Sequence, residues 1–405
     1  MTNARQRKEL TFKANTSSGR YGWLRLTPAY SLKLVKSILS EISQKSVVFD
    51  PFSGTGTTAL AAAEEGHTGI ANDVNPFLVW LGNTKLGKYS NEERQIVSDY
   101  LAGLISCKSF DDAGLWEPEI YNIERWWGRG ERAALKIIYN GITQSISNLN
   151  SQNLLKVAFC KTLITVSNAA FNHQSMSFKE SINDSNDITK QARDTMQVFV
   201  ETTQSILEDS KKDLSGTGKV YLRNSMEQFN ATETVDQIIT SPPYANRMSY
   251  IRELRPYMYW LKYITSAPEA GKLDWETIGG TWGMATSKLK DWSPKNNSPI
   301  DDQLTELCQL IKSSDSKSGS TLANYVYKYH EDMWEHFKNV YRIVRRGGAI
   351  TYIVGNSTFY NNNVPVQEFY AEMMRAAGFT NIDIQIIRKR NSNKKLYEYA
   401  VSATK

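Results

Sequence analysis

The chain has few of the side chains that usually carry out covalent or metal-dependent chemistry. Its 405 residues include only three cysteines and four histidines. The cysteines, Cys107, Cys160 and Cys308, are widely spaced, and no pair of cysteines has the spacing of a zinc site. Few and unpaired cysteines are typical of a reducing compartment, so the sequence predicts a cytoplasmic location and no metal centre.

Long apolar runs and internal repeats are also missing. No run of 18 apolar residues occurs, and the polar residues 1–8 do not resemble a secretory signal, so we expect no membrane partner. The net charge of +6 permits a polyanionic partner but does not identify one. The length fits one α/β domain of about 250 residues with one or two insertions.

A glycine loop lies early in the chain, between an expected strand and an expected helix. Residues 47–49 are apolar, residues 59–66 are rich in alanine, and the sequence D-P-F-S-G-T-G-T-T, residues 50–58, connects them. Gly54 and Gly56 let the backbone pass close under a ligand, which a Cβ would block. The order strand, glycine turn, helix is the one required of a nucleotide-binding loop.

Three classes of ligand use loops of this kind. A mononucleotide P-loop needs a lysine after the second glycine, and none follows Gly56. A dinucleotide loop needs a third glycine where this chain has Ala59. A second strand over 68–72 runs into D-V-N-P, residues 73–76, and an acid at that distance suits a ribose diol. Taken alone, the loop is also compatible with an ordinary tight turn of an α/β domain.

A second motif follows another apolar strand much further along the chain. The sequence T-S-P-P-Y, residues 240–244, comes directly after Ile238 and Ile239. Proline fixes the backbone and removes its N–H donor, so the carbonyl groups stay available to accept hydrogen bonds. Such a platform can receive the exocyclic amino group of a flat base, with the ring of Tyr244 stacked on that base.

Together these motifs resemble the DNA amino-methyltransferases, which use S-adenosylmethionine, and the S-P-P-Y form is similar to their cytosine-N4 branch. The resemblance covers residues 20–76 and 218–405. It implies an α/β fold with a doubly wound, Rossmann-like sheet of seven strands and a terminal β-hairpin, expected from residues 382–388 and 396–403.

The resemblance also assigns roles to the matched residues. The catalytic residues would be Ser241, Pro242, Pro243 and Tyr244. The S-adenosylmethionine site would consist of Thr27, Asp50, Phe52, Gly54, Gly56, Thr57, Thr58, Asp73, Asn75, Pro76, Asn224 and Ser225. Within that site, Asp50 would lie near the methionine amino group and Asp73 at the ribose, while Asn224 replaces the aspartate usual in the family. Thr27 and Pro28 would open a helix.

The chemistry would need alignment rather than a strong base. An exocyclic amine is a poor nucleophile because its lone pair is conjugated into the ring. Hydrogen bonds from its N–H groups to Ser241 Oγ and to the Pro242 carbonyl would favour a pyramidal nitrogen, and positioning contributes roughly 7–11 kcal/mol. A C5-methylating enzyme would instead need a cysteine after a proline, and none of the three cysteines has that context.

Double-stranded DNA is the expected partner, and a cognate restriction endonuclease acting on the same site is a second one. The amine is buried in a duplex, so the nucleotide must be flipped out. Arg247, Arg252 and Arg255 follow the tetrad, interleaved with aromatic residues, and are predicted to bind DNA. The apolar stripe within residues 251–261 predicts that the same segment is a core helix.

Five segments are expected along the chain. Residues 1–84 would form the amino-terminal half of the catalytic domain, 85–217 a helical insertion, 218–264 the part with the tetrad, 265–320 an irregular insertion, and 321–405 the carboxy-terminal part. Either insertion is a candidate for target recognition. Apolar spacing predicts helices over 91–105, 129–146, 153–168 and 188–214.

Two short segments of the helical insertion have two interpretations each. Residues 125–130, R-W-W-G-R-G, and residues 172–179 suit either a structural loop or contact with DNA. Other functions of the whole chain also stay open: methylation of adenine N6, methylation of RNA or of a protein glutamine, and a non-catalytic DNA-binding subunit that kept the fold.

Overall fold

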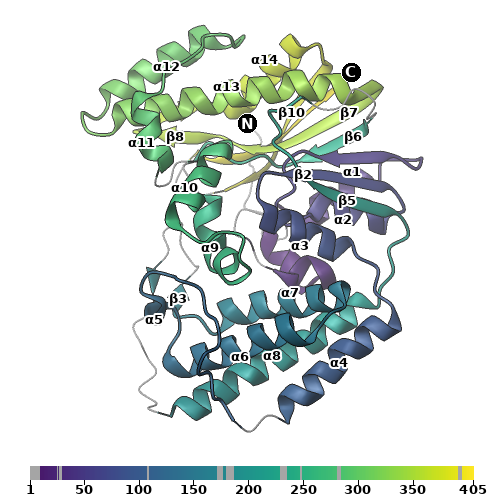
Figure 1. Cartoon of the computed structure of the whole chain (residues 1–405). Helices are drawn as coiled ribbons and strands as arrows, with labels where there is room; N and C mark the ends of the chain where they lie inside the picture. Colours follow the sequence, from purple (N-terminus) through teal and green to yellow (C-terminus); the bar gives the residue numbers. More distant parts are fainter. Residues whose placement is uncertain are drawn as a thin grey trace.

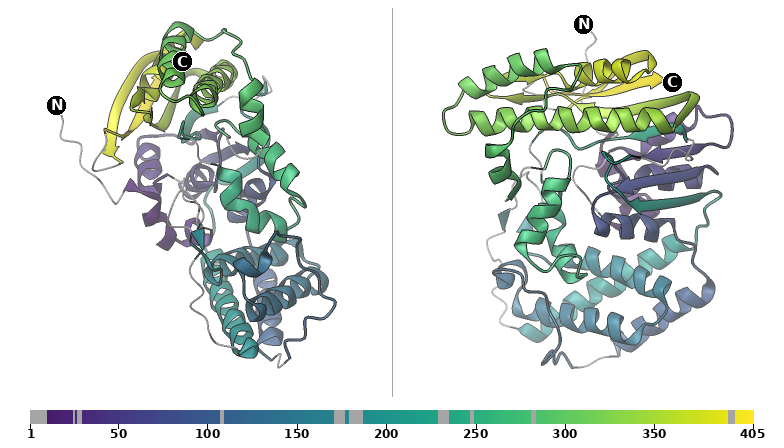
Figure 2. Two further views of the ribbon diagram at one scale, coloured as in Figure 1. Left: turned by 90° about the vertical axis from the view of Figure 1, so that its left-hand side faces the viewer. Right: turned by 45° about the horizontal axis from the view of Figure 1, so that its top comes forward.

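The computed structural model describes residues 10–24, 26, 30–106, 109–170, 177–178, 187–228, 235–246, 249–280, 284–390 and 395–405. A sheet with helices on both faces forms one part of the molecule, and a bundle of long helices forms the other (Figure 1). The views in Figure 2 show the two parts one above the other, with α9 and α10 between them on one side. The predicted α/β class is confirmed.

The sheet contains seven strands in the order β5, β2, β1, β6, β7, β11, β10. Their bounds are β1 Val47–Asp50, β2 Thr68–Asp73, β5 Thr217–Leu222, β6 Val235–Thr240, β7 Val344–Gly355, β10 Thr380–Lys389 and β11 Tyr397–Thr404. β11 pairs antiparallel with β7 and β10, and the other neighbours are parallel. The predicted seven-stranded sheet and terminal hairpin are therefore confirmed. Two further pairs are short: β3 Ala169–Ala170 with β4 Ser177–Phe178, and β8 Ser357–Phe359 with β9 Asn362–Val364.

The order of the strands reverses between β1 and β6. From β1 the chain continues outward to β2 and then β5, whereas β6 and β7 lie on the other side of β1. In an open α/β sheet, ligands bind outside the carboxyl ends of the strands at such a reversal. The glycine loop follows β1 and the tetrad follows β6, so the topology brings the two motifs to the same edge.

Alternating side chains of the central strands face two separate apolar cores. Val48 and Ile239 pack with α1 (Leu32–Leu39) and the alanines of α2 (Thr57–Glu64) on one face. Phe49 and Ile238 pack on the other face with residues of α12 (Asp301–Ser313), α13 (Gly319–Ile343) and α14 (Val366–Ala377). The 3₁₀ helices η2 (Phe12–Ser17) and η3 (Gly19–Trp23) precede α1.

Helix α1 follows the segment in which the sequence predicts the start of a helix. Its first residue is Leu32, after Ser31. Thr27 and Pro28 lie outside the described residues, so their predicted role in opening a helix stays a prediction.

A series of helices, all but α5 longer than ten residues, fills the interval between β2 and β5. They are α3 (Pro76–Leu86), α4 (Asn91–Ile105), α5 (Ile123–Trp126), α6 (Arg129–Ser145), α7 (Leu149–Thr165) and α8 (Ile188–Ser210). The four helices predicted there from apolar spacing are confirmed. In the part of the chain that the structure describes, none of the helices combines the length and apolarity needed to cross a membrane.

Helix α9 (Tyr250–Trp260) connects the bundle to the tetrad. Ile251, Leu254 and Met258 are buried, so the predicted apolar stripe is confirmed. Trp260 makes edge contacts with the rings of Trp127 and Phe159, at centroid distances of 6.1 and 5.4 Å.

The interval 265–320 was predicted to be irregular, and this prediction is wrong. It contains α10 (Ala267–Glu276), α11 (Met284–Asp291) and α12. In α12, Leu304, Cys308 and Ile311 follow one another at helical spacing and are buried. The many serines and lysines around this stripe suggest a loop by composition, whereas the spacing of the apolar residues indicates a helix.

A buried arginine fastens the amino-terminal segment to the rest of the protein. Arg20, in η3, is 4% exposed. Its Nη1 donates to the carbonyl oxygens of Lys85 and Gly87, each at 2.7 Å, and its Nη2 donates to those of Ser210 and Lys212, at 3.2 and 2.8 Å. One guanidinium thus satisfies carbonyl groups at the carboxyl ends of both α3 and α8.

Replacing this arginine should destabilise the fold. We predict that Arg20→Met lowers the free energy of unfolding by about 3 kcal/mol, because buried carbonyl groups lose their donors. Urea denaturation measures the change. Arg193→Met, at an exposed position of α8, is the matched control and should stay within about 0.5 kcal/mol of the wild type. Equal stability of the two variants would contradict the role of Arg20.

Candidate functional site

One open cavity of about 860 Å³ lies where the carboxyl ends of β1, β2, β5 and β6 meet. Its wall includes the glycine loop, the residues after β2 and β5, and the first part of the S-P-P-Y motif. The predicted site residues on the wall are Phe52, Gly54, Thr57, Asp73, Asn75, Asn224, Ser225, Ser241, Pro242 and Pro243. The structure therefore brings both predicted motifs together in one cavity.

The glycine loop is held in shape by the acid at the end of β2. Gly54 and Gly56 have φ of +50° and +78°, which favour glycine, and a Cβ on Gly56 would lie 3.2 Å from the Cα of Gly82. The backbone N–H of Gly54 donates to Asp73 Oδ2 and that of Asn75 donates to Oδ1, both at 2.9 Å. Desolvation raises the pKa of Asp73 to about 7, although these hydrogen bonds oppose the shift.

Asp50 lies beneath the cavity and connects its two halves. It is fully buried, and its Oδ1 accepts hydrogen bonds from Thr240 Oγ1 at 2.5 Å and from the N–H of Phe52 at 3.0 Å. Its Oδ2 accepts from the hydroxyl of Tyr30 at 3.4 Å. Burial raises the pKa of Asp50 to about 6 against the effect of these bonds. Asp50 therefore joins the glycine loop to the tetrad and does not reach the cavity wall.

Four of the residues predicted for the donor site are not on the wall: Asp50, Gly56, Thr58 and Pro76. Thr58 lies under the loop, where its Oγ1 donates to the carbonyl of Ile239 at 3.1 Å and also contacts the Tyr30 hydroxyl. Pro76 is the first residue of α3, a position that suits proline because the backbone N–H there would have no partner within the helix. Thr27 lies outside the described residues.

Two asparagines on the wall use part of their amide groups in the fold itself. Asn75 caps α3, with its Oδ1 accepting from the N–H of Phe77 at 3.0 Å. Asn224 Oδ1 accepts from the N–H of Met226 at 3.0 Å, and its Nδ2 donates to the carbonyl of Glu276 at 3.4 Å. Asn224 thus holds the last residue of α10 against the end of β5.

The tetrad presents an acceptor to the cavity. Ser241 Oγ donates its proton to the carbonyl of Ile353 at 3.1 Å, which leaves its lone pairs to accept a further hydrogen bond. The carbonyl of Pro243 accepts from the hydroxyl of Tyr329 at 2.8 Å, and that hydroxyl lies 2.7 Å from the hydroxyl of Tyr370. Buried tyrosines on α13 and α14 therefore fix the backbone of the motif.

Tyr244 does not line the cavity, in contrast to the stacking role predicted for it. Its hydroxyl donates to Glu398 Oε1 at 2.8 Å, and the guanidinium of Arg390 lies 5.3 Å from its ring centre. Its backbone N–H donates to the hydroxyl of Tyr250 at 3.1 Å. Burial raises the pKa of Tyr244 well above its ordinary value, and the proximity of Glu398 adds to this effect. The terminal hairpin thus holds the ring, and Tyr250 takes the place on the wall.

Sequence reasoning missed several wall residues. The cavity wall also contains Tyr30, Tyr250, Ile251 and residues 276–278, which lie at the carboxyl end of α10. Tyr30 lies in a segment that resembles the family, and Tyr250 follows the tetrad closely. The position of each residue in the sequence therefore indicates that it could line the site. No pattern pointed to residues 276–278, because their interval was expected to form a recognition surface.

The predicted DNA-binding arginines have separate locations. Arg252 and Arg255 line a second pocket, between α9 and α5, and Arg247 lies outside the described residues. Among the described residues, no group of three or more histidine, cysteine or acidic side chains is arranged to hold a metal ion.

Several known proteins are similar in sequence to this chain. Residues 32–107 match the family described as D12 class N6 adenine-specific DNA methyltransferase. Over 97% of its length the chain is 20% identical to the type II methyltransferase M.BsoBI of Geobacillus stearothermophilus, of which the match covers 85%. The chain is thus similar to DNA methyltransferases.

A second relative matches a smaller share of the chain, and one solved structure has a low structural similarity to it. The type II methyltransferase M.AvaI of Nostoc sp. is 26% identical over 61% of the chain, and the match spans 55% of that protein. The rRNA methyltransferase aviRa of Streptomyces viridochromogenes aligns with 97% of the chain and 92% of its own length, at 9% identity and a TM-score of 0.33.

The raised pKa of Asp50 has a consequence for stability. Because the pKa rises from 3.8 to about 6, the folded chain binds this proton more tightly than the unfolded chain does. The free energy of unfolding should therefore fall as the pH rises from about 4 to about 6, by up to about 3 kcal/mol. We predict that Asp50→Asn removes this contribution and makes the decline shallower, while the part that comes from Asp73, whose pKa burial also raises, remains.

Urea denaturation across this pH range tests the prediction. The matched control is Asp194→Asn, at an exposed position of α8, which should keep the wild-type pH profile. Profiles of wild type and Asp50→Asn that run parallel between pH 4 and 6 would contradict the assignment.

Proposed function

We propose that the chain transfers a methyl group from S-adenosylmethionine to the N4 amino group of a cytosine extruded from double-stranded DNA. The observation that supports this most directly is the shared cavity, whose wall contains both the glycine loop and Ser241 with Pro242. A loop for a donor and a platform for an amine, on one cavity, is the arrangement that a direct transfer requires.

The wall residues fit the proposed donor. Gly54 leaves room over the loop backbone, and Asp73 offers carboxylate lone pairs beyond the two that accept from the backbone. The apolar side chains of Leu78 and Ile278 line the same space and supply the apolar surface that small-molecule sites usually have. When bound, the donor supplies an electrophilic methyl on a sulfonium, so nitrogen gains carbon as sulfur leaves and one N–H proton passes to solvent.

The chain itself would orient the nitrogen. Ser241 Oγ, whose own proton is directed to Ile353, accepts one N–H of the amine, and the Pro242 carbonyl accepts the other. Ser241 Oγ is held by the carbonyl of Ile353, and Tyr329 holds the backbone directly after Pro242 through the Pro243 carbonyl, so little reorganisation is needed on binding. The ring of Tyr250 is the aromatic side chain beside the prolines on the wall, and we propose that it, rather than Tyr244, contacts the base.

Adenine N6 is the second candidate substrate, because the matching family is described as N6 adenine-specific. That match ends at residue 107 and so covers the donor loop and Asp73 without reaching the tetrad. The groups that would hold the base therefore lie outside it. Ser241 as the first residue of S-P-P-Y is what motivates the choice of cytosine.

Two further parts of the proposal concern partners. Duplex DNA is the proposed substrate, and both curated relatives described above are named type II methyltransferases. We propose that the methylated sequence is also the target of a cognate restriction endonuclease, against which the modification protects the host DNA.

The chemical identity of the methylated base shows which base is the substrate. We predict that DNA incubated with the protein and S-adenosylmethionine, digested to nucleosides and analysed by mass spectrometry, contains N4-methylcytosine. Heat-inactivated protein is the control. N6-methyladenine as the only product would contradict the cytosine assignment and support the second candidate. Donor binding by calorimetry without any methylated base would contradict an enzymatic role and favour a non-catalytic DNA-binding subunit.

A further inference from the structure

A second pocket lies between α5, β4 and α9. We call it the arginine pocket and define it by Tyr121, Arg125, Phe178, Arg252, Arg255 and Tyr259. Its described lining contains three arginines and no acidic side chain. Tyr121 is 86% exposed at its edge, so the pocket is open to solvent. Its charge therefore suits an anion or another group rich in hydrogen-bond acceptors.

Two of the guanidinium groups are stacked on aromatic rings. Arg125 lies over the ring of Phe178 at 4.3 Å, and Arg255 lies over that of Tyr259 at 5.9 Å. In Arg125, stacking fixes the plane of the guanidinium and leaves the N–H groups on its edge in position to donate in pairs. Paired donors match two oxygens of one phosphate, or O6 and N7 of a guanine.

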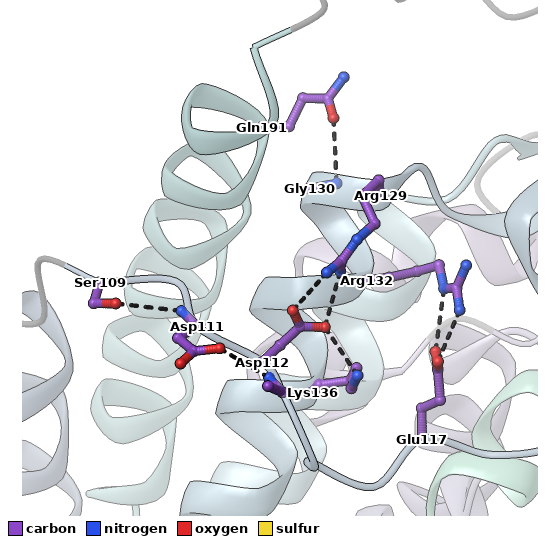
Figure 3. A network of polar contacts seen from close by, with 10 residues as sticks. Ser109, Asp111, Asp112, Glu117, Arg129, Gly130, Arg132, Lys136 and Gln191 are labelled. Carbon is purple, nitrogen blue, oxygen red and sulfur yellow. Dashed lines mark hydrogen bonds and ion pairs between the residues drawn. The ribbon is translucent and has the colours of Figure 1, made fainter.

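The loop that leads into α5 is held by ion pairs on α6, as Figure 3 shows. Asp112, 5% exposed, accepts from both terminal nitrogens of Arg129, at 2.7 and 2.8 Å, and its Oδ2 lies 2.9 Å from Lys136 Nζ. Arg132 donates twice to the carboxylate of Glu117, at 3.1 and 2.7 Å. The hydrogen bond from Arg129 is the main reason that the pKa of Asp112 lies far below its usual range.

These contacts mean that the loop carrying Tyr121 is fastened before any ligand arrives. The carboxylate of Asp112 is charged and paired over the whole physiological pH range. Arg129, Arg132 and Lys136 are occupied in this anchor, so the cations that face the pocket are a different set. A preformed site loses less conformational entropy on binding.

Helix α9 connects the arginine pocket to the proposed reaction site. Tyr250 and Ile251, in its first turn, line the donor cavity, whereas Arg252 and Arg255 line the arginine pocket. From Ile251 to Arg255 the helix rises about 6 Å, which is less than two base-pair steps of a duplex. Figure 1 shows α5 beside the end of α9 that lies away from the sheet.

We propose that the arginine pocket binds the target duplex beside the extruded base, with its guanidinium groups on paired acceptor atoms of the DNA. The two sources of such a pair are a phosphate group and the major-groove edge of a guanine. This inference rests on the proposed function, because it takes DNA as the substrate. It assigns a role to Arg125, the first residue of the segment 125–130, which the reaction itself does not use.

Binding of labelled DNA to two variants tests the pocket. Arg125→Gln changes an exposed side chain, and the double variant Arg125→Gln with Arg252→Gln removes two of the three charges. Arg375→Gln is the matched control, since Arg375 is exposed on α14 at the opposite end of the molecule (Figure 1). Fluorescence anisotropy is measured on a mixed-sequence duplex and on one containing the methylated sequence, over a range of salt concentrations.

We expect the double variant to bind DNA about tenfold more weakly or worse, with thermal unfolding unchanged and the control like wild type. With phosphate as the ligand, the loss is equal on both duplexes, and the slope of log affinity against log salt falls by about 0.9 for each contact removed. With guanine as the ligand, the loss appears only on the specific duplex, and methylation spreads to sites that differ at one guanine position.

Wild-type affinity and salt slope for both variants on both duplexes would overturn the inference. If the double variant unfolds more easily, the inference is judged from the DNA affinity and salt slope of the single variant Arg125→Gln, because that side chain is exposed. A wild-type protein that binds DNA through these arginines and yields no methylated base would contradict the proposed function alone. Methylation that does not depend on the pocket would contradict this inference alone.

Discussion

The hydrogen bond from Thr240 to the buried carboxylate of Asp50 is the contact on which the site depends. Asp50 ends β1 and Thr240 ends β6, two strands that are parallel neighbours at the point where the strand order reverses. The glycine loop starts directly after the first and the S-P-P-Y motif starts at the second. A single 2.5 Å contact therefore joins the glycine loop to the S-P-P-Y motif.

Buried polar side chains extend this connection through the sheet. His336 on α13 donates from Nδ1 to the carbonyl of Ser225 and accepts at Nε2 from the hydroxyl of Tyr352, at 3.1 and 2.7 Å. Burial lowers the pKa of His336 to about 4, so the ring is neutral and can fill both roles. Its ring also packs 4.8 Å from that of Phe52. The end of β5, the glycine loop and β7 are thus held to one helix.

The sequence predicted the parts of this arrangement that depend on local patterns. Gly54 and Gly56 require a special backbone, Pro242 and Pro243 fix theirs, and the acid at Asp73 ends an apolar strand, so each has a signal within a few residues. The same holds for the four long helices of the insertion, whose apolar spacing is regular. Such patterns span only a few residues, so they can be recognised without knowledge of the fold.

The parts that could not be predicted depend on contacts between distant segments. Tyr244 was expected on a base, but the hydroxyl acceptor that holds it, Glu398, comes from the last strand. Asp50 was expected to contact a donor, but Thr240 and Tyr30 bury its carboxylate. Likewise, nothing near residues 276–278 indicates that they close the cavity. In each case the deciding partner lies far away along the chain.

The most direct test of this account is the affinity of S-adenosylmethionine for Thr240→Val, measured by calorimetry together with the rate of methyl transfer. Because a buried carboxylate loses one hydrogen bond, the variant should bind S-adenosylmethionine about tenfold more weakly and transfer the methyl group more slowly. Thr358→Val, at an exposed position of β8, should behave like wild type. Wild-type donor affinity and wild-type transfer rate in Thr240→Val would contradict the claim that this contact holds the two halves of the site together.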